Sequence, residues 1–319
     1  MKLSIVTINY NDAKGLQKTL RSVASQILDC RLKIEDFQLE HIIVDGESTD
    51  ESVDVIKNYV ERLKAKDDEA KGEEAIRREV KWVSEKDRGI YDAMNKGLRI
   101  ALEGDCDYIQ ILNAGDCLYS DHVLSDMYQA LQEKNYPGIM YGNMIRDYGT
   151  GREAKSERRR TKGEKRDVCL GQHEWTMYDF IKGTVNHDPT WISRSMYEKY
   201  GLYDPELKIC SDWKWFVNAI VFGRGANGER IETVQPVYVP IDVTLFDVTG
   251  ISETQLEKRE AEREAELRKM LPEAVLKDYW NYHFPINQIQ RLKRHHLWPI
   301  VYFMERVLFK LEKWGILGR

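Results

Sequence analysis

The feature that most constrains the fold is a repeat of short apolar runs and helix-length segments over the first 120 residues. Runs rich in Val, Ile and Tyr predict four strands, at Leu3–Ile8, His41–Val44, Lys81–Val83 and Tyr108–Leu112. Helices are predicted after Asp12, after Ser48 to Asp50, and from Asp87 through Ala101. Because parallel strands need such crossover connections, the repeat predicts an α/β fold with a mainly parallel sheet flanked by helices.

Polar residues follow every one of these predicted strands. They are Thr7, Asn9 and Tyr10 after the first strand, Asp45 and Gly46 after the second, Ser84, Glu85 and Asp87 after the third, and Asn113, Gly115 and Asp116 after the fourth. A single carboxylate in such a place is most often a helix cap. Ligands of open α/β sheets bind beyond the carboxyl ends of the strands, so four polar ends on one edge predict a binding site there.

The chain lacks the glycine-rich loops that commonly bind nucleotides. No GxGxxG follows the first strand and no GxxxxGK[ST] occurs anywhere, which disfavours dinucleotide oxidoreductases and P-loop NTPases. A diphosphate bound without such a loop needs another neutralising group, and a carboxylate-held divalent cation is a common solution. Asp116 is the candidate ligand. The net charge of −5, from 48 Lys and Arg against 53 Asp and Glu, gives no reason to expect a nucleic-acid partner.

Cysteine usage and the chain ends bear on location. The five cysteines form no CxxC pair, which predicts a reduced, intracellular protein without a structural zinc site. The N-terminus enters the first strand directly and has no signal-peptide pattern. Charged residues interrupt the late apolar segment Leu297–Leu311, which falls short of the ~18 apolar residues of a spanning helix. We expect a cytoplasmic protein that is soluble or lies on a membrane surface.

Six ordered blocks resemble glycosyltransferase family 2, and most closely its branch that builds bacterial O-antigen and other surface polysaccharides. They are SIVTINYNDAKGLQKTLRSVASQ, IIVDGESTDES, SEKDRGIYDAMNKGL, YIQILNAGD, NHDPTWISRSMYEKYGLYDPELKICSDWKWF and FDVTGIS, and together they cover about residues 1–252. The resemblance implies a GT-A fold, a nucleotide-sugar donor, Mn²⁺ or Mg²⁺ at a DxD-type motif, and inversion at the anomeric carbon.

The resemblance assigns donor-binding roles to the strand ends. Thr7, Asn9 and Tyr10 match the positions that bind the nucleotide base, although an ordinary strand end is the alternative. Asp45 matches the carboxylate that accepts a hydrogen bond from a uracil or thymine imide, which suits an N–H donor. In the third block Arg88, Asp92 and Asn95 would face the diphosphate and the sugar, where a cation can offset phosphate charge.

The metal motif departs from the family pattern. Many relatives have Asp-x-Asp-Asp where this chain has Asn113, Ala114, Gly115 and Asp116, which leaves Asp116 as the one carboxylate. One carboxylate, two phosphate oxygens and waters can complete an octahedral site, so metal dependence is expected with weak retention of the ion. Asn113 and Gly115 would then contact the donor. His187 is the additional candidate for metal or diphosphate contact, and a structural hydrogen bond is its alternative.

Asp212 matches the family's general base, because inversion by direct displacement needs one carboxylate to remove the acceptor proton. A helix N-cap at Asp212 is compatible with that role. Trp213 and Trp215, with Trp191, form either a sugar-stacking platform or part of the buried core. The FDVTGIS block, with Gly250 as hinge and Ile251 and Ser252 beside it, resembles the flexible loop over the donor.

Two segments have unusual charge. Residues 152–166 contain eight Lys and Arg against three Glu, which predicts a surface loop that is either a solvated charge run or an anion-binding lid. Residues 253–271 predict an exposed helix that ends before Pro272. Residues 291–319 carry seven Lys and Arg against two Glu, with Ile300, Phe303, Val307, Leu311 and Trp314 on one helical stripe. This pattern predicts contact with an anionic membrane, and docking on the core or on a second copy is the alternative.

These inferences combine into one expected organisation. Residues 1–252 form the GT-A domain, with a nucleotide-binding half at 1–120 and an acceptor and catalytic half at 121–252, and residues 253–319 form a helical extension. The expected activity is inverting transfer from a UDP-sugar to a lipid-linked glycan acceptor. A sugar nucleotidyltransferase is disfavoured because no glycine- and basic-rich loop follows the first strand. A non-catalytic sugar-nucleotide-binding or scaffold protein remains an alternative, because the metal motif is depleted.

Overall fold

The structure is a computed structural model that describes residues 1–26, 37–69, 77–148, 166–169 and 174–313. Its chain divides into two compact units, Met1–Glu262 and Arg263–Arg319. The division falls inside helix α9 (Leu256–Met270), slightly beyond residue 252, where the sequence motifs end. The basic segment 152–166 lies outside the described residues except for Arg166, so its predicted lid has no structural description.

The first half of the sheet is parallel, as the sequence predicts. Its order is β3 (Arg77–Ser84), β2 (Gln38–Asp45), β1 (Lys2–Asn9) and β4 (Tyr108–Ile111), with all three pairings parallel. The connections are helices α1 (Ala13–Ala24), α2 (Ser52–Glu69) and α3 (Ile90–Glu103). The α/β class is therefore confirmed, and polar ends of β1, β2 and β4 meet at one edge of the sheet.

The second half of the sheet is mixed. The order continues through β8 (Thr190–Ser193), β6 (Ile139–Asp147), β9 (Val237–Asp247) and β5 (Cys117–Leu118), while β7 (Arg166–Cys169) pairs with β6. Only the β6–β9 pairing is parallel in this half. Its helices are α4 (Val123–Glu133), α5 (Met177–Lys182), α6 (Arg194–Tyr200), α7 (Ser211–Val217), which continues as a π-helix over Asn218–Phe222, and α8 (Ile251–Thr254).

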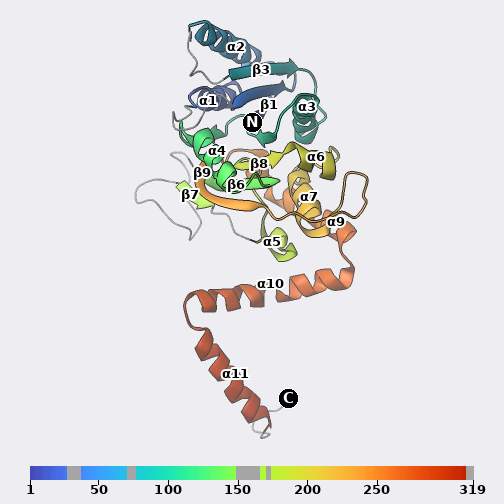
Figure 1. Cartoon of the computed structure of the whole chain (residues 1–319). Helices are drawn as coiled ribbons and strands as arrows, with labels where there is room; N and C mark the ends of the chain where they lie inside the picture. The colour runs from blue at the N-terminus through green and yellow to red at the C-terminus, as the bar shows by residue number, and fades with distance from the viewer. Residues whose placement is uncertain (27–36, 70–76, 149–165, 170–173, 314–319) are drawn as a thin grey trace. The chain divides into compact units, whose positions relative to one another are not determined.

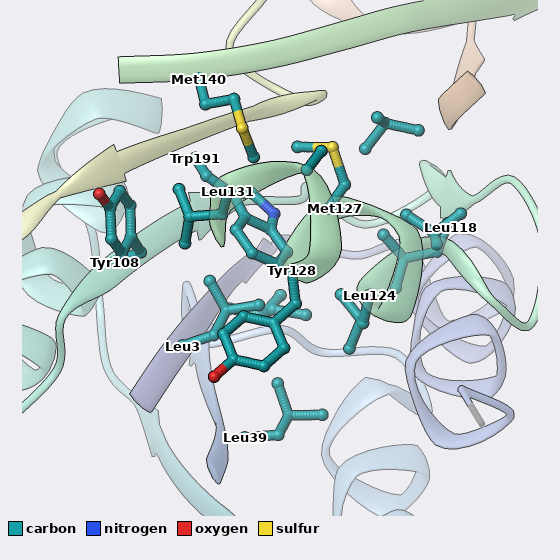
Figure 2. Packing of buried hydrophobic residues seen from close by; sticks show 14 of the residues in the cluster. Leu3, Leu39, Tyr108, Leu118, Leu124, Met127, Tyr128, Leu131, Met140 and Trp191 are labelled. Atoms are coloured by element: carbon teal, nitrogen blue, oxygen red, sulfur yellow. The ribbon is translucent and has the colours of Figure 1, made fainter. Parts of the chain in front are cut away.

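Strand alternation divides the core between the two sheet faces. Leu3, Ile5 and Ile43 point to the same face of the sheet. There Leu3 and Ile5 pack against α4, and Ile43 packs against α1 and α2. On the opposite face α3 packs so closely that a Cβ on Gly97 would lie 2.3 Å from a methyl carbon of Val6. Figure 1 shows these helices on either side of the strands. Figure 2 shows the larger cluster, in which Leu124, Met127 and Leu131 of α4 lie with Leu3 and Trp191.

The structure confirms one predicted helix start, at Asp12, and changes another, at Asp87. Asp12 is the N-cap of α1, and its Oδ1 accepts a hydrogen bond from the Gly15 N–H at 2.9 Å, which confirms that prediction. The prediction for Asp87 is wrong, because the N-cap of α3 is Gly89 at φ +151°. Asp87 instead accepts a hydrogen bond from Lys96 Nζ at 2.6 Å. A positive φ is unfavourable for residues with a Cβ. The turn therefore has glycine at position 89, and the helix begins after it.

The C-terminal region is helical, as predicted. Helix α9 ends before Pro272, and α10 (Glu273–Arg294) and α11 (Trp298–Lys313) follow it. Within this unit Arg268 lies over the Trp280 ring at 4.9 Å, and Lys293 lies over the Trp298 ring at 5.2 Å. Among the helices that the structure describes, none combines the length and the apolar character that crossing a bilayer requires.

Candidate active site

The edge formed by the ends of β1 and β2 is centred on Asp45, whose carboxylate is buried and fully hydrogen-bonded. Its Oδ1 accepts from Ser48 Oγ at 2.6 Å and from Asn9 Nδ2 at 2.8 Å. Its Oδ2 accepts from Ser84 Oγ at 2.7 Å and from the Ser48 N–H at 3.0 Å. Burial by itself would raise the pKa of Asp45, but these donors outweigh it and lower the pKa. Asp45 is therefore an anion held in place by β1, β3 and the following turn.

Thr7 does not face a ligand in this structure. Its side chain is fully buried, and Oγ1 lies 2.9 Å from Nε2 of His41, whose Nδ1 lies 2.8 Å from the Tyr59 hydroxyl. Burial lowers the pKa of His41 to about 3, so the ring is neutral and structural. The predicted contact of Thr7 with the base is corrected to a core hydrogen bond, because the Thr7 side chain lies with Leu3 and Ile5 on the sheet face that α1, α2 and α4 cover.

Tyr10, by contrast, extends from the edge with 69% of its surface exposed. It lies beside Gly46, where an added Cβ would be 3.1 Å from the Tyr10 ring and 2.8 Å from Asp87 Oδ2. Glycine at position 46 thus lets the ring pack close to the end of β2. Asn9 contributes an acceptor, because its Oδ1 is buried and has no hydrogen-bond partner among the described residues. The edge presents an aromatic face and an unsatisfied acceptor beside the buried Asp45 anion.

Three predicted donor contacts, Arg88, Asp92 and Asn95, lie at or near the start of α3. The first two bond to each other, and the third is bonded inside the domain. Arg88, with its side chain 70% exposed, bonds to Asp92 Oδ1 through Nη2 at 3.0 Å. The hydrogen bond from Arg88 is the main cause of the lowered pKa of Asp92. Asn95 is buried, and its amide bonds to both the N–H and the C=O of Tyr203. The predicted donor contact of Asn95 is corrected to a structural cross-link, because its polar atoms are already paired inside the domain.

A second group of polar residues, Asn113, Asp116, His187, Asp188 and Asp212, forms what we call the carboxylate cluster. Asp212 lies in the first turn of α7, where Oδ1 accepts from the Tyr91 hydroxyl at 2.7 Å and Oδ2 lies 3.2 Å from His187 Nδ1. The N-cap of α7 is Cys210, so Asp212 is not the cap. His187 Nε2 lies 3.2 Å from Asn113 Nδ2, which joins the end of β4 to this group.

Charges in the carboxylate cluster oppose one another. Burial would lower the pKa of His187, but the carboxylates of Asp188 and Asp212 outweigh it and raise the pKa to about 9. Burial would likewise raise the pKa of Asp212, yet His187 and the Tyr91 hydroxyl lower it, so this carboxylate is ionised. Burial and the nearby charge of Asp188 raise the pKa of Asp116 well above its usual range. Asp116 and Asp188 therefore favour sharing one proton.

The backbone around Asp116 is fixed by neighbouring elements. Gly115 has φ +97° and donates its N–H to Thr19 Oγ1 at 3.0 Å, and the same hydroxyl donates to the Asp116 carbonyl at 2.7 Å. Asp116 Oδ1 accepts from the Asp247 N–H at 2.8 Å, which ties it to the end of β9. An added Cβ on Gly115 would lie 3.5 Å from Asp247 Cβ. The glycine thus serves the turn, and nothing in the structure requires it for ligand contact.

The donor atoms of this cluster suit a hard divalent cation. Among the described residues, Asn113 Oδ1 is a buried oxygen without a hydrogen-bond partner, Asp188 Oδ1 lies 3.3 Å from His187 Nε2, and burial beside Asp188 raises the pKa of Asp116. Oxygen ligands with open positions match Mg²⁺ and Mn²⁺, which keep several waters or phosphate oxygens. No group of three or more His, Cys, Asp or Glu within the described ranges is arranged to hold a metal by itself. The residues therefore fit an ion that a diphosphate would complete.

The tryptophans belong to the core. Trp191, Trp213 and Trp215 are all buried, and the indole N–H of Trp213 donates to the Phe180 carbonyl at 2.8 Å. The acceptor-platform role of Trp213 is corrected to the buried alternative, because its ring has almost no exposed surface. Trp215 donates likewise to the Gly201 carbonyl at 2.8 Å. Both rings support α7 from inside the domain.

The predicted loop over the donor spans the end of β9 and the start of α8. Gly250 is the N-cap of α8 with φ −63°, a conformation open to any residue, so its backbone shows no special need for glycine. Ile251 is exposed, and the Ser252 carbonyl oxygen accepts a hydrogen bond from Arg259 Nη1 at 2.9 Å. Glu253 forms an ion pair with Arg146 at 3.0 Å.

Two important residues escaped the sequence prediction. Tyr91 is buried on α3 and contacts Asp212 across 121 positions of sequence, so no local pattern reveals the pair. Asp188 lies next to the predicted His187, and that adjacency to a histidine was the available signal. The structure places Asn113, Asp116, His187 and Asp212 in one cluster, with both additional residues beside them.

The mixed α/β sheet, with polar strand ends at one edge and a carboxylate cluster at α7 and the end of β4, agrees with the GT-A glycosyltransferase fold that the sequence motifs imply. The family model for "Glycosyl transferase family 2" matches residues 4–201. The chain therefore belongs to glycosyltransferase family 2, and it is a glycosyltransferase.

Individual relatives agree with this assignment. An uncharacterized glycosyltransferase of Mycobacterium tuberculosis is 26% identical over 251 residues, covering 78% of this chain and 76% of the relative. A PGL/p-HBAD biosynthesis glycosyltransferase of Mycobacterium bovis is 25% identical over 210 residues, covering 66% of each chain.

Solved structures support the fold. The Staphylococcus aureus protein TarS, residues 1–349 in complex with UDP, has a TM-score of 0.52 at 16% identity, over 89% of this chain and 72% of that one. The mannosyltransferase PcManGT of Pyrobaculum calidifontis, in complex with GDP-Man and Mn²⁺, has a TM-score of 0.51 at 14% identity, over 81% of this chain and 60% of that one. At these identities the likeness shows the fold alone.

Proposed function

We propose that this glycosyltransferase moves a sugar from a UDP-sugar to a hydroxyl of a lipid-linked glycan acceptor in surface-glycan synthesis, with inversion at the anomeric carbon. The observation that carries the proposal is Asp212, an ionised carboxylate held between the Tyr91 hydroxyl and His187. A single fixed carboxylate suits direct displacement, which needs one base and forms no covalent intermediate.

In this mechanism Asp212 accepts the proton of the acceptor hydroxyl as its oxygen bonds to the anomeric carbon. The bond between that carbon and the diphosphate oxygen breaks on the opposite side, and its electron pair leaves with the nucleoside diphosphate. Tyr91 and His187 orient the carboxylate, so its geometry is set before the acceptor arrives. The cationic His187 also offsets the negative charges that gather in the cluster.

Asp116, with Asp188 and Asn113 beside it, would hold a divalent cation. Bound Mn²⁺ or Mg²⁺ supplies positive charge that stabilises the departing diphosphate. The clustering of the buried oxygen donors of Asn113, Asp116 and Asp188 around His187 supports this assignment, as does the Mn²⁺ in the PcManGT complex. The charge of Arg88, exposed at the start of α3, would act on the same diphosphate.

The donor assignment rests on the edge formed by β1 and β2. Tyr10 offers an exposed ring on which a base can stack, and Asn9 Oδ1 offers an acceptor for a base N–H. Asp45 would accept the uracil imide N–H in exchange for one of its present donors, the Ser48 hydroxyl. TarS complexes with UDP and UDP-GlcNAc support a uridine donor, whereas the PcManGT complex contains GDP-Man.

A lipid-linked acceptor agrees with the surface of α11. On an ideal helix of 100° per residue, Leu297, Ile300, Phe303, Met304, Val307 and Leu308 fall within an arc of about 140°. These six side chains are exposed, and Arg306 and Lys310 follow on the side of the arc next to Phe303. An apolar arc bordered by cations is typical of helices that lie on anionic lipid. We propose that α11 places the enzyme at the cytoplasmic face of a membrane.

Replacement of the base tests the catalytic proposal. We expect Asp212→Asn to lower the rate of UDP-GlcNAc hydrolysis or transfer with Mn²⁺ by about 100-fold or more, because the amide cannot accept the proton. Asp126→Asn on the exposed surface of α4 is the matched control. Full activity of Asp212→Asn would contradict the assignment of Asp212 as the general base. If the unmodified chain binds UDP-GlcNAc but transfers the sugar to no acceptor tested, a non-catalytic binding protein is favoured.

Flotation with vesicles containing anionic phospholipid tests the membrane proposal on the full chain. Phe303→Asp places a charge in the apolar arc, and we expect it to reduce flotation strongly. Tyr302→Asp changes an aromatic of similar exposure, 53% against 68%, on the opposite side of the helix, and we expect a small effect. Equal flotation of the two variants would show that this arc does not mediate the contact.

A further inference from the structure

The turn that leads into α7 is bound by a carboxylate from a helix beyond the family motifs. Glu262 of α9 accepts three backbone hydrogen bonds from consecutive residues. Its Oε1 accepts from the Lys208 N–H at 2.7 Å, and its Oε2 accepts from the Ile209 N–H at 2.8 Å and the Cys210 N–H at 2.9 Å. One side chain thus fixes the whole backbone of residues 208–210.

The local sequence does not supply this support. The N-cap of α7 is Cys210, which makes no side-chain capping bond, and a turn entering a helix leaves backbone N–H groups without partners. Within the turn itself, Ser211 Oγ accepts from the Asp204 N–H at 2.6 Å and Lys214 Nζ bonds to Asp204 at 2.8 Å. Hydrogen bonds to an ionised acceptor are stronger than neutral ones, so Glu262 is the principal fixed point from outside the segment.

Asp212 follows this fixed backbone by two residues. Its two carboxylate oxygens must meet the Tyr91 hydroxyl and the His187 ring at the same time, at 2.7 Å and 3.2 Å. A shift in where α7 begins would move the carboxylate relative to both partners. The position of the proposed base therefore depends on the register that Glu262 imposes on residues 208–210.

Helix α9 also contacts the loop after β9. Arg259, one turn before Glu262, donates from Nη1 to the Ser252 carbonyl at 2.9 Å. The first half of α9 therefore bonds to the Gly250–Ser252 segment and to the turn before Asp212. These two contacts join the part of α9 up to Glu262, which lies outside the matched residues 4–201, to the rest of the compact unit that ends at Glu262.

We infer that Glu262 is a positioning residue for the catalytic carboxylate, and that α9 is a required part of the active site. This inference rests on the proposed function, in which Asp212 is the general base. Glu262 acts on the reaction through the backbone of residues 208–210 and touches no substrate. Its removal misplaces the base and leaves the donor-binding residues of β1 and β2 in place.

The test compares kcat and KM for UDP-GlcNAc with Mn²⁺ in three full-length variants. We expect Glu262→Ala to lower kcat by about 10- to 100-fold, since misplacement of a catalytic group by about 1 Å can cost 100-fold. The KM should stay within about twofold. Glu262→Gln retains an acceptor oxygen and should be intermediate. Glu264→Ala removes an exposed carboxylate that pairs with Arg268 on the same helix, and it should match the unmodified chain.

A positioning role has a second signature that loss of structure alone would not produce. In the Asp212→Asn background, Glu262→Ala should change the residual rate by less than about twofold, because there is no base left to position. A kcat of Glu262→Ala equal to that of Glu264→Ala would overturn the inference. If Glu262→Ala does not fold, Glu262→Gln decides by the same criterion. Full activity of Asp212→Asn would instead refute the proposed function itself.

Discussion

The β1–β2 edge and the carboxylate cluster are both polar and largely buried, yet their electrostatics differ. At the β1–β2 edge, Asp45 receives four hydrogen bonds and His41 stays neutral, so the buried carboxylate and the buried imidazole are both satisfied. In the carboxylate cluster, burial raises the pKa of both Asp116 and Asp188, and the nearby charge of Asp188 raises that of Asp116 further. Satisfied polar groups like those of the first region stabilise a fold, whereas strongly perturbed groups like those of the second commonly mark functional sites.

Removal of Asp45 should give the largest change in stability. Asp45→Ala leaves the Ser48, Ser84 and Asn9 donors without their shared acceptor, and we expect a loss of about 3 to 4 kcal/mol in the free energy of unfolding. Urea denaturation measures the change. Asp54→Ala, an exposed carboxylate on α2, should change stability by less than about 0.5 kcal/mol. Equal midpoints for both variants would contradict the structural role of this edge.

The neutral His41 should make the fold sensitive to acid. Its pKa falls from 6.5 in the unfolded chain to about 3 in the fold, so between these values only the unfolded chain binds the proton. Acid therefore favours unfolding, and His41 should remove about 2 kcal/mol of stability between pH 7 and pH 5. His41→Gln should flatten this part of the pH profile, while His122→Gln on the surface should not. Parallel profiles for all three chains would show that His41 is not buried neutral.

Removal of a carboxylate from the carboxylate cluster should raise the free energy of unfolding, whereas removal of Asp45 lowers it. Asp116→Asn removes a repelled charge, and its amide oxygen can still accept from the Asp247 N–H. We expect the free energy of unfolding to rise by about 1 kcal/mol while transferase activity falls at least 100-fold. Thermal unfolding and a transfer assay with Mn²⁺ measure the two effects. A variant that is both less stable and fully active would contradict the distinction between the regions.

Tyr10 should affect stability least. Its ring is exposed, so Tyr10→Ala should change the free energy of unfolding by less than about 0.5 kcal/mol. Loss of base stacking, worth about 1 to 3 kcal/mol, should still raise the KM for the donor roughly 10-fold. Steady-state kinetics checks this against Tyr119→Ala, a second exposed tyrosine. An unchanged KM would remove the stacking role from the β1–β2 edge.

The sequence by itself determined the parallel half of the fold and much of the site. Apolar alternation and the Asp12 cap located strands and helices, because these depend on neighbours within a few positions. The ordered motifs identified Asp116, His187 and Asp212 as candidates for separate roles, and the structure places them in one cluster. The family and the helical extension were likewise predictable.

Only the tertiary structure decided how individual side chains are used. Thr7 pairs with His41, Asn95 with Tyr203, and Trp213 lies in the core, although each occupies a position that the motifs associate with a ligand. Tyr91 and Glu262 acquire their roles through partners 121 and 52 to 54 positions away. The reason is physical: burial and hydrogen bonding depend on which elements pack together, and sequence spacing does not encode that proximity.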